Sequence, residues 1–344
     1  MSINGARQSF RKMQRINWID WVKAFCMTVV VFCHLPQQGD SFYAQYLGAI
    51  NLSAFFFISG YLKKPLATQK ELFKKYGYSL LIPYIIYNVI YYPYWFAKFY
   101  IEHGGITIDE CLKPITGTLL LQINTSFSSE LNGVTWFLPA LFMMHWITDL
   151  CNRQKHGKSI MIIITIITII LYGANKFYNF APYLTFIGFM RCICFFFMGN
   201  LFQKAGYIKV LSTKKDILIG TSTLLLSFAI FYWHIHEDCF SLQIILYYVV
   251  NIFSVYGIIY LCRSINNLKI KAITTISVGT MLIFGIHRIL IGFFDFGFEK
   301  LLHIADIIYN CYECIILAIV IETILLPFII YAKSHYPILL GKKY

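Results

Sequence analysis

Charged residues are scarce in this chain of 344 residues. Lys, Arg, Asp and Glu make up 13% of it, whereas soluble globular domains contain roughly 25%. Hydrophobic residues reach 58%, and the mean hydropathy is +0.63. A soluble protein of this size could not cover its surface with so little charge, and intrinsic disorder requires few apolar residues. The composition excludes both classes and indicates a polytopic membrane protein.

Features of several other protein classes are also missing. The chain shows no repeat of fixed period and no long Gly/Ser linker, which excludes fibrous repeats and predicts a single integral-membrane domain over residues 1–344. No small-residue cleavage pattern follows the first apolar segment, so this segment is interpreted as a retained span and not as a signal peptide.

The ten cysteines form no recognisable framework. Cys311 and Cys314 have CxxC spacing, but no second CxxC and no His pair accompanies them, so no metal site is predicted. Cys111 and Cys239 both fall on the predicted outer side, and whether they form a disulfide stays open at this stage.

Ten windows are apolar enough to cross a bilayer as helices, the fourth and fifth being short. They predict an all-α, polytopic helical bundle. The windows run approximately from Trp18 to Leu35, Tyr46 to Leu62, Tyr76 to Phe96, Thr135 to Leu150, Ser159 to Tyr172, Tyr183 to Phe202, Ile217 to Trp233, Leu242 to Cys262, Ile276 to Phe294 and Ile307 to Tyr331.

The basic residues test this count independently, because cytoplasmic loops carry an excess of Lys and Arg. With the N-terminus in the cytoplasm, 22 of the 29 Lys and Arg residues fall in inner segments and four in outer ones. Both termini are therefore predicted to be cytoplasmic, with the largest extracytoplasmic loop at 97–134. The net charge of +13 is explained by orientation, so no nucleic-acid partner is predicted.

The remaining three cations and three histidines fall within predicted spans. Ionisable residues there are costly and usually face an internal cavity, which makes each a functional candidate. Structural alternatives are snorkelling to the interface for the first cation and packing for the middle histidine. For Arg191, His287 and Arg288 the alternative is an ion pair with Glu322 or Glu313. The six residues are Lys23, Arg191, Arg288, His34, His145 and His287.

The first predicted helix carries two of them. Lys23 and His34 are eleven residues apart, which places them within about 20° of one helix face and about 16 Å apart along the axis. Asp20 precedes Lys23 by three residues and can pair with it, but it lies about 21 Å from His34, which leaves a Ser-His-Asp arrangement unsupported. An outer imidazole with inner cations suits transfer between an anionic cytoplasmic donor and an outer acceptor. It suits a proton-coupled transporter equally well.

Several motifs together resemble the acyltransferase 3 family of bacterial membrane acyltransferases. The hallmark of that family is a basic residue, ten intervening residues and then His, here Lys23 and His34, although the family usually has Arg at the first position. The combination of motifs is most similar to the fucose 4-O-acetylase-related branch. In order, the motifs are RINWIDWVKA at 15–24, FFFISGY at 55–61, IPY at 82–84, WFLPALF at 136–142, Arg191 with FFFMG at 195–199, and SVGTMLIFGIH at 277–287.

The resemblance implies O-acyl transfer, most simply of acetyl, from cytoplasmic acyl-CoA to a hydroxyl of a cell-surface or lipid-linked saccharide. It further implies the bacterial inner membrane as the location, no bound cofactor, and His34 as the base or transient acyl carrier. The implied catalytic residues are His34, Lys23, Arg191, His287 and Arg288, with Lys74, Lys75, Ser59 and Gly60 at the donor and Trp136 and Tyr84 at the substrate.

Two other interpretations stay open. A transporter or flippase could use the same intramembrane polar groups as relays, although no inverted repeat is visible. A polysaccharide polymerase would favour larger outer loops rich in Arg, and the predicted outer side holds Lys alone among the basic residues. The oligomeric state is not readable from the sequence.

Overall fold

The computed structural model describes residues 15–37, 42–206, 212–301 and 308–342, and these residues form helices without any named strand. The predicted start of the last span at Ile307 lies outside them. The described residues contain twelve α-helices: α1 Asn17–His34, α2 Phe42–Tyr61, α3 Gln69–Tyr76, α4 Ile82–His103, α5 Ile108–Leu119, α6 Phe137–Arg153, α7 Gly157–Tyr178, α8 Leu184–Ala205, α9 Thr213–Ile235, α10 Phe240–Ser264, α11 Lys271–Leu301 and α12 Cys311–His335.

Each predicted span falls on one long helix, so the prediction of a polytopic helical membrane protein is confirmed. Within the described ranges, eight helices are long and apolar enough to cross a membrane. The two remaining predicted spans fall on α1, which contains Asp20 and Lys23, and on the tyrosine-rich α4. The fifth predicted span was too short, because α7 extends over 22 residues.

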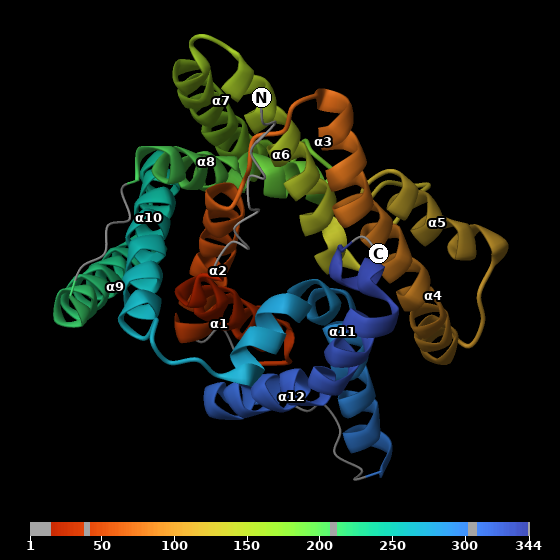
Figure 1. The fold of residues 1–344 in the computed structure, drawn as a ribbon. Coiled ribbons are helices and arrows are strands. Elements are labelled where there is room, and N and C mark those ends of the chain that lie inside the picture. The colour runs from red at the N-terminus through yellow and green to blue at the C-terminus, as the bar shows by residue number, and fades with distance from the viewer. Residues whose placement is uncertain (1–14, 38–41, 207–211, 302–307, 343–344) are drawn as a thin grey trace, which may run out of the picture.

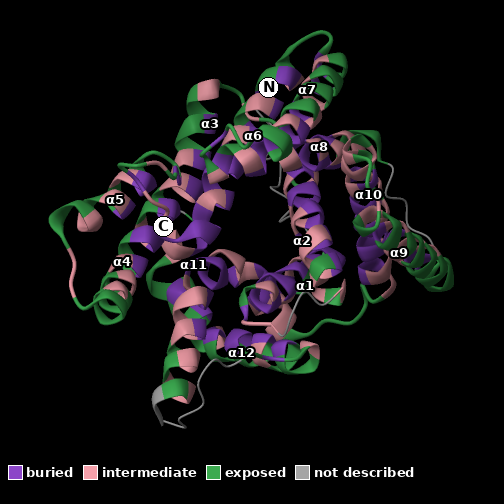
Figure 2. Ribbon diagram, turned by 180° about the vertical axis from the view of Figure 1, so that it is seen from behind, coloured by how far each residue is buried: buried purple, intermediate pink, exposed green. Residues whose placement is uncertain are grey.

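The other helices surround a central group made of α1, α2, α6, α8 and α11 (Figure 1). Burial follows this arrangement, since the most apolar window of α6 is 72% buried and that of α9 only 17%. Figure 2 shows the exposed residues concentrated on the peripheral helices α7 and α9. Apolar side chains on these outer helices, such as Ile166 and Leu225, are exposed, as expected for surfaces that face lipid.

Two glycines set the spacing between α2 and α8. A Cβ atom on Gly60 would lie 2.0 Å from the Phe196 carbonyl oxygen, and one on Gly199 would lie 2.0 Å from the Phe57 carbonyl oxygen. Each helix therefore approaches the backbone of the other at a point where no side chain fits. This contact fixes the position of α2, which supplies part of the site described below.

The predicted outer loop at 97–134 is partly helical. α4 continues to His103, and α5 begins with a capping box made by Thr107 and Glu110. Beyond α5, Gln122 donates to the side chains of Asn88 and Thr135 at 3.1 and 3.0 Å.

The end of the same segment is tied to α11. The Asn132 amide donates to the carbonyl oxygen of Gly285 at 3.0 Å. These buried bonds hold the segment on α4, α6 and α11, close to one of the candidate histidines.

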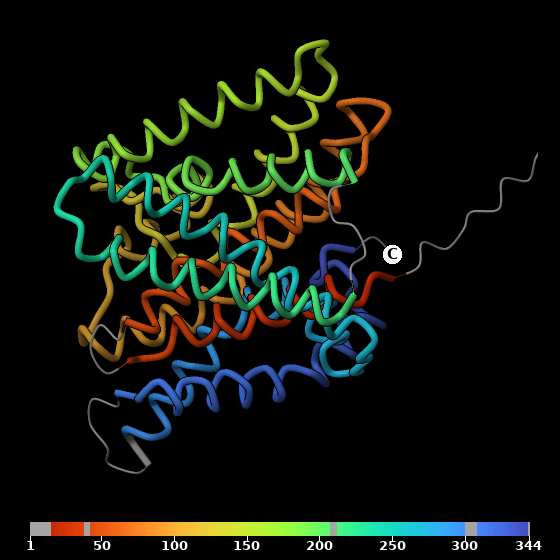
Figure 3. The backbone as a smooth tube through the Cα atoms, turned by 90° about the vertical axis from the view of Figure 1, so that its left-hand side faces the viewer, coloured from red at the N-terminus to blue at the C-terminus, as the bar shows by residue number. Residues whose placement is uncertain are grey.

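The C-terminal segment folds back onto the bundle. After α12, the short 3₁₀ helix η3 Pro337–Leu340 packs beside η1 Gly77–Leu81, a π-helical turn that joins α3 to α4. The Tyr87 hydroxyl donates to the Leu339 carbonyl, and Gly341 follows with φ of +64°. The first and last described residues lie at the same end of the bundle (Figure 3), as an even number of spans requires.

All ten cysteines are free thiols, and only Cys239 is exposed. Cys111 and Cys239 are therefore both free, and no disulfide joins them. Across the described residues, no group of three His, Cys, Asp or Glu side chains is arranged to hold a metal ion.

Candidate active site

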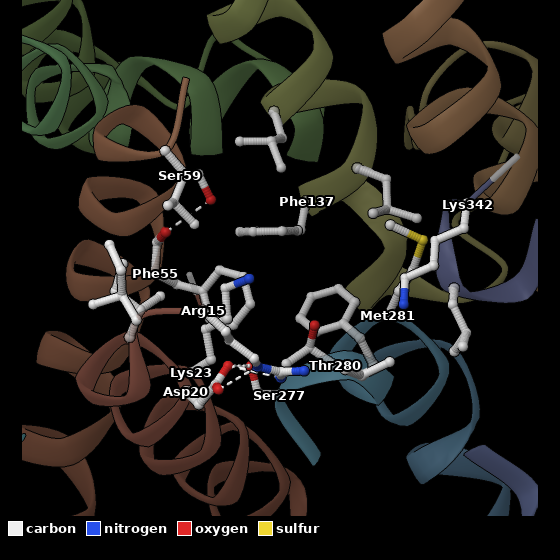
Figure 4. A pocket seen from close by; sticks show the side chains of 18 residues that line it. Arg15, Asp20, Lys23, Phe55, Ser59, Phe137, Ser277, Thr280, Met281 and Lys342 are labelled. Atoms are coloured by element: carbon white, nitrogen blue, oxygen red, sulfur yellow. Dashed lines mark hydrogen bonds and ion pairs between the residues drawn. The ribbon is translucent and has the colours of Figure 1, made fainter. Parts of the chain in front are cut away.

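A cavity of about 570 Å³ lies at the end of the bundle that holds the first and last described residues, Arg15 and Lys342. Four helices and the C-terminal segment contribute to it (Figure 4). Its lining comprises Arg15, Ile16, Ile19, Asp20 and Lys23 at α1, Phe55, Ser59 and Leu62 at α2, Phe137, Leu138 and Leu141 on α6, Ser277, Val278, Thr280, Met281 and Phe284 on α11, and Leu340 and Lys342.

The charges of this cavity are predominantly positive. Arg15 Nε lies 2.5 Å from Asp20 Oδ2, and Ser277 donates to Asp20 Oδ1 at 2.6 Å. The single lining carboxylate is therefore occupied by Arg15 and Ser277, in place of the predicted pair with Lys23. The Lys23 ammonium makes no ion pair with any residue that the structure describes. Three cations against one anion suit an anionic ligand.

The third cation, Lys342, belongs to the C-terminal segment. Burial lowers the pKa of its ammonium, and the positive charges of Lys333 and Arg15 lower it further. Burial is the larger cause of this lowered pKa, and the smaller part that Lys333 and Arg15 add comes from repulsion between neighbouring cations. An anionic ligand would relieve the repulsion between these cations.

Aromatic rings close the inner end of the cavity. The Phe137 ring lies 5.2 Å from that of Phe55 and 5.1 Å from that of Phe284, between centroids. Phe284 in turn contacts His287 at 6.3 Å. We call Phe55, Phe137 and Phe284 the aromatic layer. Neither His287 nor His34 lines the cavity, so the aromatic layer separates both histidines from the cavity.

Beyond the aromatic layer, His34 and His287 meet edge to face, with ring centroids 5.0 Å apart. Nδ1 of His34 lies 2.7 Å from the Val30 carbonyl oxygen, and Nδ1 of His287 lies 2.9 Å from the Ile283 carbonyl oxygen. Because a carbonyl only accepts, both Nδ1 atoms carry a proton, and in the neutral ring Nε2 has a free lone pair. The sequence did not reveal this pairing.

The two histidines differ in access. His287 is 0% exposed, and its Nε2 has no hydrogen-bond partner. His34 is exposed. Arg288 interacts electrostatically with both rings and with Tyr91 and Tyr94 of α4. One accessible base with a nearby guanidinium is the arrangement that proton abstraction with oxyanion stabilisation needs.

Arg191 lies in a different environment. It interacts electrostatically with Tyr172 of α7 and Tyr247 of α10, whose rings are 6.1 Å apart. No hydrogen bond or ion pair among the described residues joins it to either histidine of the pair. The structure therefore groups Arg288 with the histidines and places Arg191 among tyrosines.

The predicted alternative of ion pairs with the last helix is wrong. Glu322 accepts a hydrogen bond from Thr28 Oγ1 at 2.8 Å, and Glu313 forms a capping box with Asn310 at the start of α12. Neither carboxylate pairs with a candidate cation in the part of the chain that the structure covers.

The predicted donor residues separate into two groups. Ser59 lines the cavity, and its hydroxyl donates to the Phe55 carbonyl at 2.9 Å. Gly60 faces α8 instead, at the close helix contact described above. Lys74 and Lys75 are exposed on α3 and do not line the cavity.

Among the predicted substrate residues, Trp136 packs its indole against Gly188 of α8, where an added Cβ would lie 1.9 Å from the ring. Tyr84 is 1% exposed and donates to the Thr118 carbonyl at 2.6 Å. His145 is stacked on the Tyr76 ring at 3.8 Å, which agrees with a packing role.

Two cationic cavity residues were not predicted as site residues. Arg15 belongs to the basic N-terminal segment, whose charge was assigned to membrane orientation. Its place as the first residue of the RINWIDWVKA motif was the available signal. Lys342 has no local signal, because only the fold-back of the C-terminal segment brings it to the cavity.

Comparison with known families bears on this geometry. The model of the acyltransferase 3 family, described as an acyltransferase domain, matches residues 16–332. The chain belongs to this family. It is a multi-pass membrane acyltransferase, and the match covers the histidine pair and every cavity residue except Arg15, Leu340 and Lys342. No curated protein matches this acyltransferase, and no solved structure does.

Proposed function

We propose that this acyltransferase moves an acetyl group from cytoplasmic acetyl-CoA to a hydroxyl of a cell-surface or lipid-linked saccharide. One observation carries the proposal: a cation-lined cavity ends on an aromatic layer, and a histidine pair with one accessible member lies directly behind it. The motifs favour the fucose 4-O-acetylase-related branch, and the distribution of basic residues favours a bacterial inner membrane with the cavity facing the cytoplasm.

The donor is proposed to enter the cavity with its phosphates against Arg15, Lys23 and Lys342. Ammonium groups bind phosphates as point charges, so Lys23 serves here without the planar fork of an arginine. The thioester arm would then extend toward the aromatic layer. Passage of the acetyl group to the histidine pair requires these rings to move.

In the proposed reaction, Nε2 of His34 accepts the proton of the acceptor hydroxyl. The hydroxyl oxygen attacks the thioester carbonyl carbon, and the positive charge of Arg288 stabilises the resulting oxyanion. The carbon–sulfur bond then breaks, and the leaving thiolate takes the proton from Nε2 of His34 and departs as the free thiol, which returns His34 to its neutral form. His287, in ring contact with His34, would hold that imidazole in place.

Substitution of the accessible histidine tests this proposal. His34→Ala is expected to lower acetyl transfer at least about 100-fold, the lower range for a lost general base. The measurement is transfer of labelled acetyl from acetyl-CoA to membrane glycolipid, at equal abundance of the variants. His103→Ala is the matched control, because His103 is also exposed and has the same Nδ1 contact with a carbonyl four residues earlier, but its ring stacks on Phe99 at the end of α4. Unchanged transfer by His34→Ala would refute the assignment.

The acceptor is identified by mass spectrometry of surface glycans from cells with and without the gene. An acetyl ester adds about 42 mass units to a hydroxyl. Loss of this mass from a glycan in cells without the gene would identify both the acyl group and the glycan. Unchanged glycan masses, together with substrate accumulation in sealed vesicles, would favour a transporter instead.

A further inference from the structure

A second pocket, of about 470 Å³, lies where α2, α6 and α8 end. It is distinct from the donor cavity, because Leu62 lines the cavity whereas the next residue, Lys63, lines this pocket. The donor cavity and this pocket share no lining residue. The pocket is formed by Lys63, Pro65, Leu66, Asp149, Asn152, Arg153, Asn200, Gln203 and Lys204.

Lys63 is buried in an unusual way for a lysine. Its side chain is 1% exposed, and its ammonium lies 3.5 Å from Asp149 Oδ1 without any hydrogen-bond partner. Burial lowers the pKa of Lys63, and Asp149 opposes this shift. A buried ammonium has three donors to satisfy, and leaving them unfilled is costly.

Asp149 offers Lys63 one oxygen only, Oδ1 at 3.5 Å, because two other donors already use Oδ2. Arg153 Nε donates to Asp149 Oδ2 at 2.6 Å, and the Gln69 amide donates to the same oxygen at 2.8 Å. The two terminal nitrogens of Arg153 donate to the carbonyls of Ala67 and Leu66. The Arg153 guanidinium is thus fixed by protein groups, while the Lys63 ammonium remains available.

On the opposite side of the pocket, Lys204 donates to Asn152 Oδ1 at 2.6 Å, and the Asn152 amide donates to Asn200 Oδ1 at 3.2 Å. Three cations against one carboxylate leave the pocket with a net charge of +2. Phosphate oxygens are the acceptors that match ammonium and amide donors held in this way.

We propose that this pocket binds a phosphate group, with the Lys63 and Lys204 ammonium groups as its charged donors. The pocket is separate from the donor cavity, so the proposal stands whether or not acetyl-CoA is the donor. The phosphate can belong to a lipid headgroup at the membrane surface or to a small anion in solution.

The test uses the full chain purified in an uncharged detergent. One arm titrates inorganic phosphate at constant ionic strength, the other titrates phosphatidylglycerol, and the thermal unfolding midpoint is followed in both. We expect a saturable rise of the midpoint in at least one arm, and that arm identifies the source of the phosphate. No saturable rise in either arm would overturn the proposal.

A matched pair of variants assigns the binding to this pocket. Lys204→Met removes an exposed pocket lysine and is expected to weaken half-saturation roughly tenfold, as for the loss of one charge-assisted hydrogen bond. Lys64→Met removes the same charge from an exposed residue outside the pocket, and it should change half-saturation less than twofold. Equal effects of the two variants would overturn the proposal.

Lys63→Met provides a second, independent variant. Its fold is expected to persist, because Asp149 keeps Arg153 and Gln69 as partners. The saturable response should disappear while the midpoint without ligand stays close to that of the wild type. Retention of the full response would show that Lys63 does not face the ligand and would refute its assignment.

Discussion

Backbone carbonyls determine how single side chains of the histidine pair can react. The Val30 and Ile283 oxygens hold the protons of His34 and His287 on Nδ1, so the lone pair of each neutral ring is on Nε2. Exposure then distinguishes the two residues, because only His34 is accessible. Our proposal therefore places the base chemistry on one nitrogen of one residue, Nε2 of His34.

At the same scale, Lys23 is expected to act by charge alone. Since Asp20 is bound by Arg15 and Ser277, Lys23→Arg should keep KM for acetyl-CoA within about twofold, whereas Lys23→Met should raise it roughly tenfold with little change in kcat. Steady-state kinetics in membranes check both values. Lys70→Met, on the exposed surface of α3, is the control, and a kcat loss for Lys23→Arg would contradict the charge-only role.

At the scale of elements, the α2–α8 contact matters most for the site, because it fixes the position of α2. Gly60→Ala places a methyl group 2.0 Å from a backbone oxygen, which neither helix can avoid without moving apart. We expect a loss of about 1–3 kcal/mol in stability, as for overpacked interiors, seen as a lower thermal unfolding midpoint in detergent. Gly77→Ala is the matched control, because a Cβ there meets nothing within 4 Å.

The aromatic layer joins three elements, α2, α6 and α11, and is expected to keep water from the thioester. Phe284→Ala should therefore increase hydrolysis of acetyl-CoA relative to transfer and admit longer acyl chains. Thiol release without glycolipid, and transfer assayed with butyryl-CoA, measure the two effects. Phe293→Ala, on the exposed face of α11, should leave both unchanged, and an equal response of the two variants would exclude a barrier role for the layer.

Elements were predictable from local sequence more often than their contacts were. Apolar length and the alternation of basic loops predict all ten long helices, because membrane insertion selects for both properties. The π-helical turn before α4 and the polar contacts of Gln122 and Asn132 depend on neighbours distant in sequence. For this reason the loop at 97–134 could not be recognised as partly helical.

The site shows the same difference between features set by local sequence and features set by contacts between distant residues. His34 and Lys23 share one helix, so spacing alone could place them on one face. The contact of His34 with His287 joins α1 to α11, and the contribution of Lys342 requires the chain end to return to the bundle. Arg191 and Arg288 looked equivalent in sequence, and only packing separates them.

At the scale of the whole molecule, the geometry predicts that the acyl donor and the acceptor reach the protein from opposite sides of the membrane. The cations of the cavity lie at the end of the bundle that holds the first and last described residues, so we expect acetyl-CoA to support transfer only from that side. In sealed inverted vesicles, added acetyl-CoA is expected to acetylate glycolipid, whereas right-side-out vesicles should require permeabilisation. Equal rates in the two preparations would contradict a one-sided donor cavity.

The free thiol of Cys239 provides a way to establish which face of the bundle is which. It precedes α10 and is the exposed one of ten cysteines, in a connection predicted to lie outside. A maleimide that cannot cross the bilayer should therefore modify intact cells fastest at this position, because the other nine thiols are buried or only partly exposed. The native chain thus carries its own label for orientation.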